Sequence, residues 1–209
     1  MANMEQVLDI YKKPYDKLHP VVCMDESPKQ LIEAKGQIAI SPGQERKVDY
    51  EYIRHGMVNI FMANEPLCGK RLVKITERKT KKDWASFVKD ISESYADADK
   101  ITLVMDNLRT HTLSAFYEAF SPEEARRLRK RFEFVFTPKH GSWLNMAEIE
   151  LQVLSRQCLN RHLSTKEKVI REVKAWEQRR NSIKSTINWQ FTTESARIKL
   201  KRLYPSYND

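Results

Sequence analysis

The sequence predicts an α/β domain with a mixed five-stranded central sheet, flanked by helices and followed by a helical C-terminal extension. Three observations predict it. Short apolar runs typical of buried strands alternate with segments of helical periodicity, in the order three strands, helix, strand, helix, strand, helices. No repeat, low-complexity tract or internal linker interrupts them. The 209 residues, 41% hydrophobic and 31% charged, suffice for one domain with a sizeable core.

The first part of the chain divides into a leader and the start of the main domain. Residues 1–19 form a leader in which an apolar helical face, formed by Val7, Leu8 and Tyr11, is expected to dock on the main domain, residues 20–209. The continuous apolar run 21–24 follows Pro20 and predicts a buried strand that ends at Asp25 and Glu26. A long loop is expected over residues 27–47, which contain Pro28, Gly36, Pro42 and Gly43.

Two further strands and a helix complete the first half. Residues 57–63 form a second apolar run, and residues 71–76 alternate as a third strand does. Thr80 and Asp83 have the spacing of a capping box. The helix that they introduce has one apolar face: Trp84, Phe87, Val88, Ile91 and Tyr95.

The second half begins with a fully apolar strand and ends with helices. Residues 101–105 predict a strand buried on both faces that leads directly into Asp106, and residues 132–136 predict another. Between them, residues 112–131 are expected to be helical, in one or two pieces broken at Pro122. Helices are also predicted over residues 145–159, after a capping box of Ser164 and Glu167, and over residues 192–203. The helix after Ser164 has this apolar face: Val169, Ile170, Val173 and Trp176.

The net charge of +9 is concentrated near the C-terminus. Residues 156–202 contain 13 basic and four acidic side chains, whereas residues 1–155 contain 24 basic and 23 acidic ones. A second basic cluster consists of Arg126, Arg127, Arg129, Lys130 and Arg131. Such clusters attract polyanions, and we expect nucleic acid as the partner, although solvated helix faces would have the same composition.

Other features narrow the class of protein. Three distant cysteines without a paired motif favour reduced thiols over disulfides or a zinc site. No apolar stretch has the length of a membrane span, and the N-terminus lacks the pattern of a signal peptide, so a cytoplasmic protein is expected. No glycine-rich phosphate-binding motif is present, so use of ATP or NAD is not supported.

Acidic side chains at strand ends are the candidate chemistry. Asp25 and Asp106 each follow a buried strand, and the ends of neighbouring strands can converge in one crevice. Carboxylates that lie close together repel unless a proton or cation separates them, and all-oxygen ligands suit Mg²⁺ or Mn²⁺. A third carboxylate for a second ion would come from Glu148 or Glu150, between which periodicity does not decide. Two such ions support in-line displacement at phosphorus.

Three segments resemble the bacterial insertion-sequence branch of the Tc/mariner transposase superfamily, which uses a DDE active site. They are Val-Val-Cys-Met-Asp-Glu at residues 21–26, Val-Met-Asp-Asn-Leu-Arg-Thr-His at residues 104–111, and Thr-Pro-Lys-His-Gly-Ser-Trp-Leu-Asn-Met-Ala-Glu-Ile-Glu at residues 137–150. The resemblance covers about residues 5–205 and implies a ribonuclease H-like fold. It also implies that Asp25, Asp106 and Glu148 bind two Mg²⁺ ions, with Mn²⁺ as a substitute. Met146 departs from the proline that is frequent in the family.

The resemblance also implies partners and an activity. DNA strand cleavage at transposon ends would be followed by transfer of the 3′-hydroxyl into target DNA, at a TA step, by a homodimer in the bacterial nucleoid. The helix-turn-helix part usual in the family is absent from this chain, so we expect DNA binding that is weak, salt-sensitive and independent of sequence. DNA or phosphate contacts are predicted near the acids and in the basic cluster: Asn107, His111, His140, Trp143, Asn145, Arg126, Arg127, Arg129, Lys130 and Arg131.

Two alternative functions remain from the sequence. One is another ribonuclease H-like nuclease, such as a junction resolvase, against which the motif at residues 137–150 argues. The other is a transposase-derived DNA-binding protein without activity, against which the presence of all three acids argues.

Overall fold

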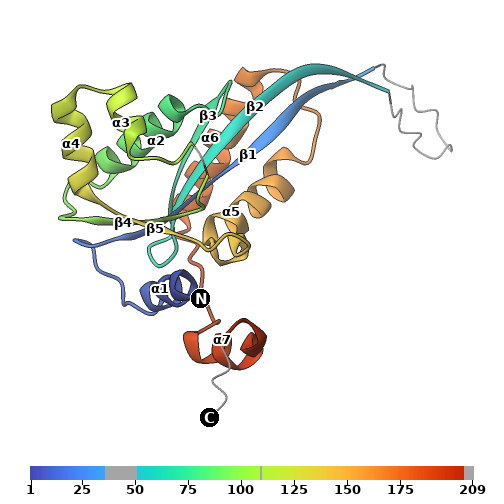
Figure 1. Cartoon of the computed structure of the whole chain (residues 1–209). Coiled ribbons are helices and arrows are strands. Elements are labelled where there is room, and N and C mark those ends of the chain that lie inside the picture. Colours follow the sequence, from blue (N-terminus) through green and yellow to red (C-terminus); the bar gives the residue numbers. More distant parts are fainter. Residues whose placement is uncertain (36–50, 109, 205–209) are drawn as a thin grey trace, which may run out of the picture.

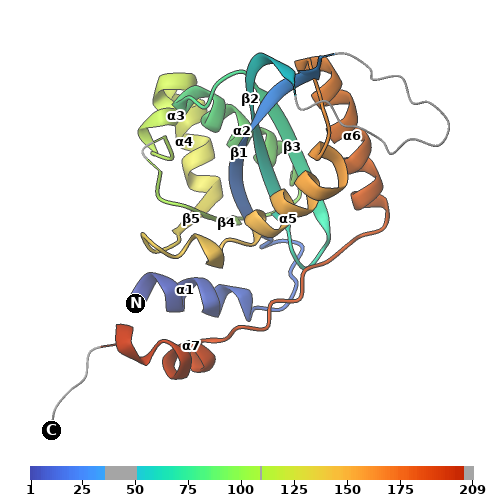
Figure 2. The same ribbon diagram turned by 90° about the vertical axis from the view of Figure 1, so that its right-hand side faces the viewer.

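The computed structural model describes residues 1–35, 51–108 and 110–204. Its centre is one mixed sheet in the order β3-β2-β1-β4-β5 (Figures 1 and 2). The strands are β1 (Val21–Ala34), β2 (Tyr52–Glu65), β3 (Lys70–Thr76), β4 (Ile101–Met105) and β5 (Phe132–Phe136). β1 pairs with β2 and β2 with β3 antiparallel, whereas β1–β4 and β4–β5 are parallel. The predicted five-stranded mixed sheet is confirmed.

β1 is much longer than the sequence indicated. The strand passes through Asp25 and remains paired with β2 to Ala34, so the predictions of a strand end at Asp25 and of a loop from residue 27 were wrong. Among the described residues, β1 pairs with β4 only from Val21 to Cys23; beyond this point no described strand pairs with that side of β1, although the Ile32 N–H donates to the Leu163 carbonyl at 3.0 Å. Such an edge tolerates Pro28, which lacks an N–H group. The rest of the expected loop, residues 36–47, lies outside the described residues.

Three helices cover one face of the sheet, which we call face A. They are α2 (Lys81–Ser94), α3 (Ser114–Ala119) and α4 (Pro122–Arg131), and they pack on alternate residues of β1 and β4, such as Val22 and Leu103. The predicted capping box at Thr80 begins α2. Ser121 caps α4, whose first residue is Pro122, so the predicted break at Pro122 is also confirmed.

The remaining helices cover the opposite face, face B (Figure 2). α5 (Met146–Leu154), extended by a π-helical turn (Ser155–Leu159), and α6 (Lys166–Ser182) pack over β1, β2 and β3. The start of α5, together with α1 (Ala2–Tyr11) and α7 (Thr193–Lys199), covers Cys23, Val104 and Val135. Short 3₁₀ turns, η1 (Ser142–Leu144) and η3 (Lys201–Leu203), precede α5 and follow α7.

Two details of α6 differ from the prediction. Its N-cap is Thr165, whose hydroxyl accepts the backbone N–H of Lys168, not Ser164. Val169, Val173 and Trp176 are buried as predicted, but the side chain of Ile170 is 41% exposed, since the part of α6 that meets the sheet is narrower than the apolar stripe.

α6 also closes the outer edge of β3. Asn181 accepts the backbone N–H of Arg71 at 2.8 Å and donates to the Arg71 carbonyl at 2.9 Å. Glu177 accepts the N–H of Val73 at 2.9 Å. Side chains of α6 therefore hydrogen-bond to the backbone groups of β3 that point away from β2.

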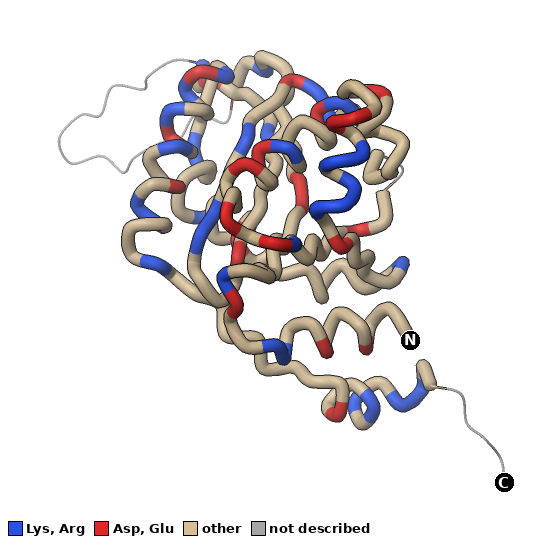
Figure 3. Tube along the Cα trace, turned by 90° about the vertical axis from the view of Figure 1, so that its left-hand side faces the viewer, with Lys and Arg blue, Asp and Glu red and all other residues tan. Residues whose placement is uncertain are grey.

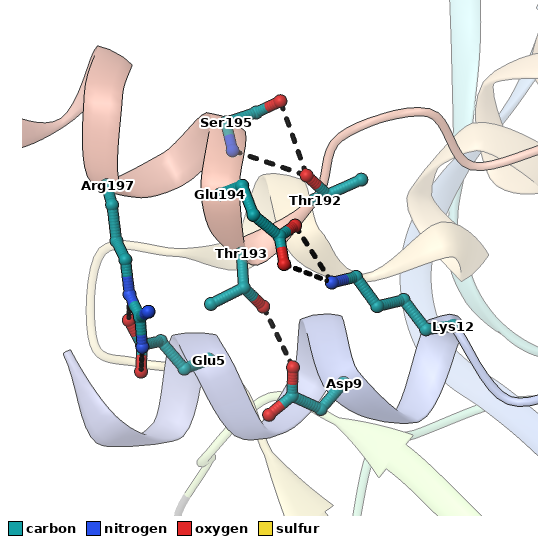
Figure 4. A network of polar contacts seen from close by, with 8 residues as sticks. All are labelled: Glu5, Asp9, Lys12, Thr192, Thr193, Glu194, Ser195 and Arg197. Carbon is teal, nitrogen blue, oxygen red and sulfur yellow. Dashed lines mark hydrogen bonds and ion pairs between the residues drawn. The ribbon is translucent and has the colours of Figure 1, made fainter.

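The first and last α-helices of the described chain lie side by side, with α7 packed along α1 (Figure 4). Glu5 pairs with Arg197 and Lys12 with Glu194, while Thr193 donates to Asp9. Of the apolar face predicted for residues 1–19, Val7 and Leu8 are buried and Tyr11 is half-buried. The three cysteines are free, as predicted, and no helix among the described residues is long and apolar enough to cross a membrane.

Candidate active site

Asp25 and Asp106 are neighbours across the β1–β4 pair. The parallel register aligns Val21 with Thr102, Val22 with Leu103 and Cys23 with Val104. Asp25 and Asp106 each come two residues after the last aligned pair of these parallel strands, and the negative charge of Asp106 contributes to the raised pKa of Asp25. Side chains alternate between faces along β1, so Asp25 shares face B with Cys23, which lies in its core cluster, whereas Asp106 follows the end of β4 and its carboxylate contacts His111. The parallel pairing of β1 and β4 therefore directs both acids to the same end of the sheet, where they interact electrostatically.

Glu148 reaches the same place through the first turn of α5. Asn145 caps this helix by accepting the N–H of Ala147 at 3.1 Å, and its side-chain amide donates to the Met24 carbonyl at 2.8 Å. Asn145 is fully buried. One side chain thus begins α5 and attaches that beginning to β1 next to Asp25, which sets Glu148 over face B.

The electrostatics of Asp25 reflect this crowding. Burial raises the pKa of Asp25 to about 7, and the negative charges of Asp106, Glu26 and Glu148 contribute to the rise. A hydrogen bond from the Glu26 N–H, 2.7 Å from Asp25 Oδ1, opposes it. A carboxylate whose pKa is raised by burial and by neighbouring negative charges marks a site where a cation would be stabilised.

The donor set fits a hard divalent cation. All three groups offer oxygen, and Asp106 Oδ1 is buried, with an ion-pair contact to His111 Nδ1 at 2.9 Å but without a hydrogen bond of good geometry among the described residues. In the described ranges, however, no three His, Cys, Asp or Glu side chains are arranged as a ready metal site. The residues therefore suit Mg²⁺ or Mn²⁺ by chemistry and charge, and ligation requires adjustment of their side chains.

Glu150, the alternative third acid, has another role. Its carboxylate is 1% exposed and accepts Arg71 Nε at 2.8 Å, Arg71 Nη2 at 2.7 Å and Arg180 Nη2 at 2.9 Å. These bonds join α5 to β3 and α6 and leave Glu150 occupied by two guanidinium groups. This triad has no local signal in the sequence, because Arg71 and Arg180 are 79 and 30 positions from Glu150.

A buried acid and a histidine lie behind the aspartates. Glu26, which follows Asp25 but belongs to face A, has a side chain only 1% exposed and contacts Lys79 and His111. Burial alone would raise the pKa of Glu26, but His111 and Lys79 hold it below its usual value. Burial alone would lower the pKa of His111, but Asp106 and Glu26 together raise it to about 9. Sequence reasoning missed Glu26, although alternation along β1 places it opposite Asp25.

Two of the predicted DNA contacts require correction. His111 is 3% exposed and Asn145 is fully buried, so neither can touch a phosphate in this structure, and their polar groups serve the fold instead. Asn107 and His140 are exposed beside the acids. Trp143 is 44% exposed and packs against Trp189 and Phe191.

The basic cluster of α4 is directed away from the acids. α4 ends at Arg131, immediately before the first residue of β5, which pairs with the first residue of β4, whereas Asp106 follows the last residue of β4. Figure 3 shows the Lys and Arg positions of this helix in blue. Arg127 pairs with Glu124, and Arg131 donates to the carbonyls of Tyr95 and Ala96. Arg126, Arg129 and Lys130 remain exposed.

Comparisons with known proteins agree with this geometry. Three similar solved structures are a Mos1 strand transfer complex (14% identity, TM-score 0.56), a Mos1 transposase paired-end complex with the left transposon end (13%, 0.58) and a Mos1 mariner paired-end complex with Mn (15%, 0.56). Each match covers 85% of this chain and 52–53% of the other, so the chain spans about half of their length. No curated protein matches significantly.

These likenesses confirm the ribonuclease H-like fold that the sequence motifs predicted. The family model of the DDE superfamily endonucleases matches residues 20–171, which include all three acids and the elements that carry them. This chain belongs to the DDE superfamily of endonucleases.

Proposed function

We propose that this chain is the catalytic part of a transposase, which cleaves DNA strands at transposon ends and transfers the 3′-hydroxyl to target DNA. The observation that carries the proposal is the electrostatic interaction of Asp25 with Asp106 and Glu148, at the end of the parallel β1–β4 pair to which Asn145 attaches the first turn of α5. The solved relatives are transposase complexes with paired ends and with a strand-transfer product, which supports the same chemistry here.

Asp25, Asp106 and Glu148 would hold two Mg²⁺ ions, for which Mn²⁺ can substitute. When bound, such ions lower the pKa of an attacking water or hydroxyl and stabilise the leaving oxygen. The protein's part is to present the three carboxylates from β1, from the residue that follows β4 and from the first turn of a capped helix. Relatives crystallised with Mn and with Mg support this choice of cation.

The DNA partner would meet face B near the acids. Asn107, His140 and Trp143 are exposed there and are the proposed contacts. Trp143 offers an aromatic surface on which a base can stack. Because two transposon ends have to be joined, we propose a homodimer as the active form, with recognition of the ends supplied by a helix-turn-helix part outside this chain.

Incubation of supercoiled plasmid with the protein and Mn²⁺ tests the proposal. Nicking that Asp106→Asn abolishes would support it. Asp97→Asn is the matched control, since Asp97 is 77% exposed and pairs with Lys17 before the start of β4. DNA binding without nicking would favour the inactive transposase-derived protein. Preferential cleavage of four-way junctions would favour a resolvase.

A further inference from the structure

The imidazole of His111 lies between two carboxylates that belong to neighbouring strands. Its Nδ1 lies 2.9 Å from Asp106 Oδ1 and donates a hydrogen bond to the Asp106 carbonyl at 3.1 Å. Its Nε2 lies 3.2 Å from Glu26 Oε2. The side chain of His111 has no exposed surface, and its ring stacks on Trp84 with centroids 5.5 Å apart. The ring is therefore held on three sides.

The second carboxylate is itself fixed from outside. Glu26 Oε1 lies 2.9 Å from the Nζ of Lys79, whose side chain is 43% exposed in the segment between β3 and α2. A continuous chain of ionisable groups thus runs from the surface at Lys79 through Glu26 and His111 to Asp106. Glu26 belongs to β1 and Asp106 follows β4, so the imidazole bridges the two strands from face A, behind the acids.

Asp106 needs such support. It lies immediately beyond the last residue of β4, where the ladder to β5 ends with Met105 and Phe136, so no strand pairing fixes its backbone. His111, five positions further on, holds both the carbonyl and the carboxylate of Asp106 and so closes this segment upon itself. A histidine buried only for packing would not require carboxylates at both ring nitrogens, since burying charge is costly unless each group is paired.

We propose that His111 is a positioning residue: through Nδ1 it fixes Asp106 for metal binding, and through Nε2 it is itself fixed by Glu26. This inference rests on the proposed function, because it assigns His111 a role toward the metal that Asp106 would bind. Partners of metal ligands of this kind orient the ligand and typically contribute about 10–100-fold to metal affinity or activity.

Two substitutions separate the two ring nitrogens. The side-chain amide of His111→Asn occupies the place of Nδ1 and retains a donor toward Asp106, whereas that of His111→Gln occupies the place of Nε2 and retains only the donor toward Glu26. A third, His111→Phe, keeps a ring against Trp84 and removes both donors. For each, we would measure Mn²⁺ affinity by calorimetry without DNA, plasmid nicking in Mn²⁺, and thermal unfolding in EDTA.

The proposal expects Mn²⁺ affinity and nicking to fall about 10–100-fold in His111→Gln and His111→Phe, and less than about tenfold in His111→Asn. This order would hold whatever the order of their unfolding temperatures. Equal Mn²⁺ affinity in His111→Asn and His111→Gln, or losses that follow thermal stability alone, would overturn it. If the wild-type protein neither bound Mn²⁺ nor nicked DNA, the proposed function would fail first, and this inference with it.

Discussion

Glu148 and Glu150 lie two residues apart on α5, but replacement by Gln should remove activity at Glu148 and stability at Glu150. Glu150→Gln keeps the shape of the side chain but leaves Arg71 and Arg180 without a counter-charge, at a site where the Arg71 and Glu150 side chains are each 1% exposed. Breaking a buried ion pair from one side costs about 3–5 kcal/mol. At about 2–4 °C per kcal/mol for a domain of this size, the midpoint of thermal unfolding should fall by roughly 6–20 °C.

Glu148→Gln is the matched control. Glu148 is only partly buried, has no ion pair among the described residues, and its charge adds to the repulsion at Asp25. Its removal should change the free energy of unfolding by less than about 1 kcal/mol in EDTA, while abolishing nicking in Mn²⁺.

Thermal scans and urea titrations followed by circular dichroism measure the change in stability, and plasmid nicking by the same samples measures the change in activity. If Glu150→Gln were as stable as the wild type yet inactive, while Glu148→Gln retained activity, Glu150 would be the metal ligand and the reasoning from burial would be refuted.

Three further predictions concern stability. Because burial and the neighbouring acids raise the pKa of Asp25 to about 7, from about 3.9 in the unfolded chain, ionisation of Asp25 opposes folding. In EDTA, therefore, the wild type should lose stability relative to Asp25→Asn as the pH rises from about 4 through 7; parallel pH curves in urea titrations would contradict this. Gly69→Ala should lower the free energy of unfolding more than Gly56→Ala in the same titrations. Both glycines have positive φ, but only at Gly69 would the new Cβ lie 2.5 Å from the backbone of Lys184. Equal losses of stability would show that this contact relaxes freely. Asn145→Ala should lower the free energy of unfolding by about 1–3 kcal/mol, through loss of an N-cap and of a buried bond to β1; a full-stability variant in thermal scans would exclude that role.

Local signals in the sequence were sufficient for most elements. The apolar run at residues 101–105, the capping box at Thr80 and Pro122 after Ser121 each act within a few residues, and each was predicted correctly. β1 beyond Asp25 was missed, because Pro28 and mixed polar residues resemble a loop, and only pairing with β2 keeps them extended.

The site was partly predictable for the same reason. Asp25 and Asp106 could be predicted as site residues because each follows an apolar run. That β1 and β4 lie side by side depends on tertiary pairing, which the local sequence does not specify. Periodicity did not distinguish Glu148 from Glu150, since the distinction depends on Arg71, which is 79 positions from Glu150. The burial of His111 likewise depends on Trp84 and Glu26, which contact it from other elements.

The way α6 covers β3 has a consequence for how the molecule behaves in solution. The unpaired backbone groups of an exposed edge strand can pair with a strand of another molecule. In β3, the outward-pointing backbone groups of Arg71 and Val73 are already hydrogen-bonded to Asn181 and Glu177. Self-association that adds a strand at this margin is thereby discouraged. Replacement of both residues by alanine would free these backbone groups to pair with a strand of another molecule, while the rest of the sheet stayed intact.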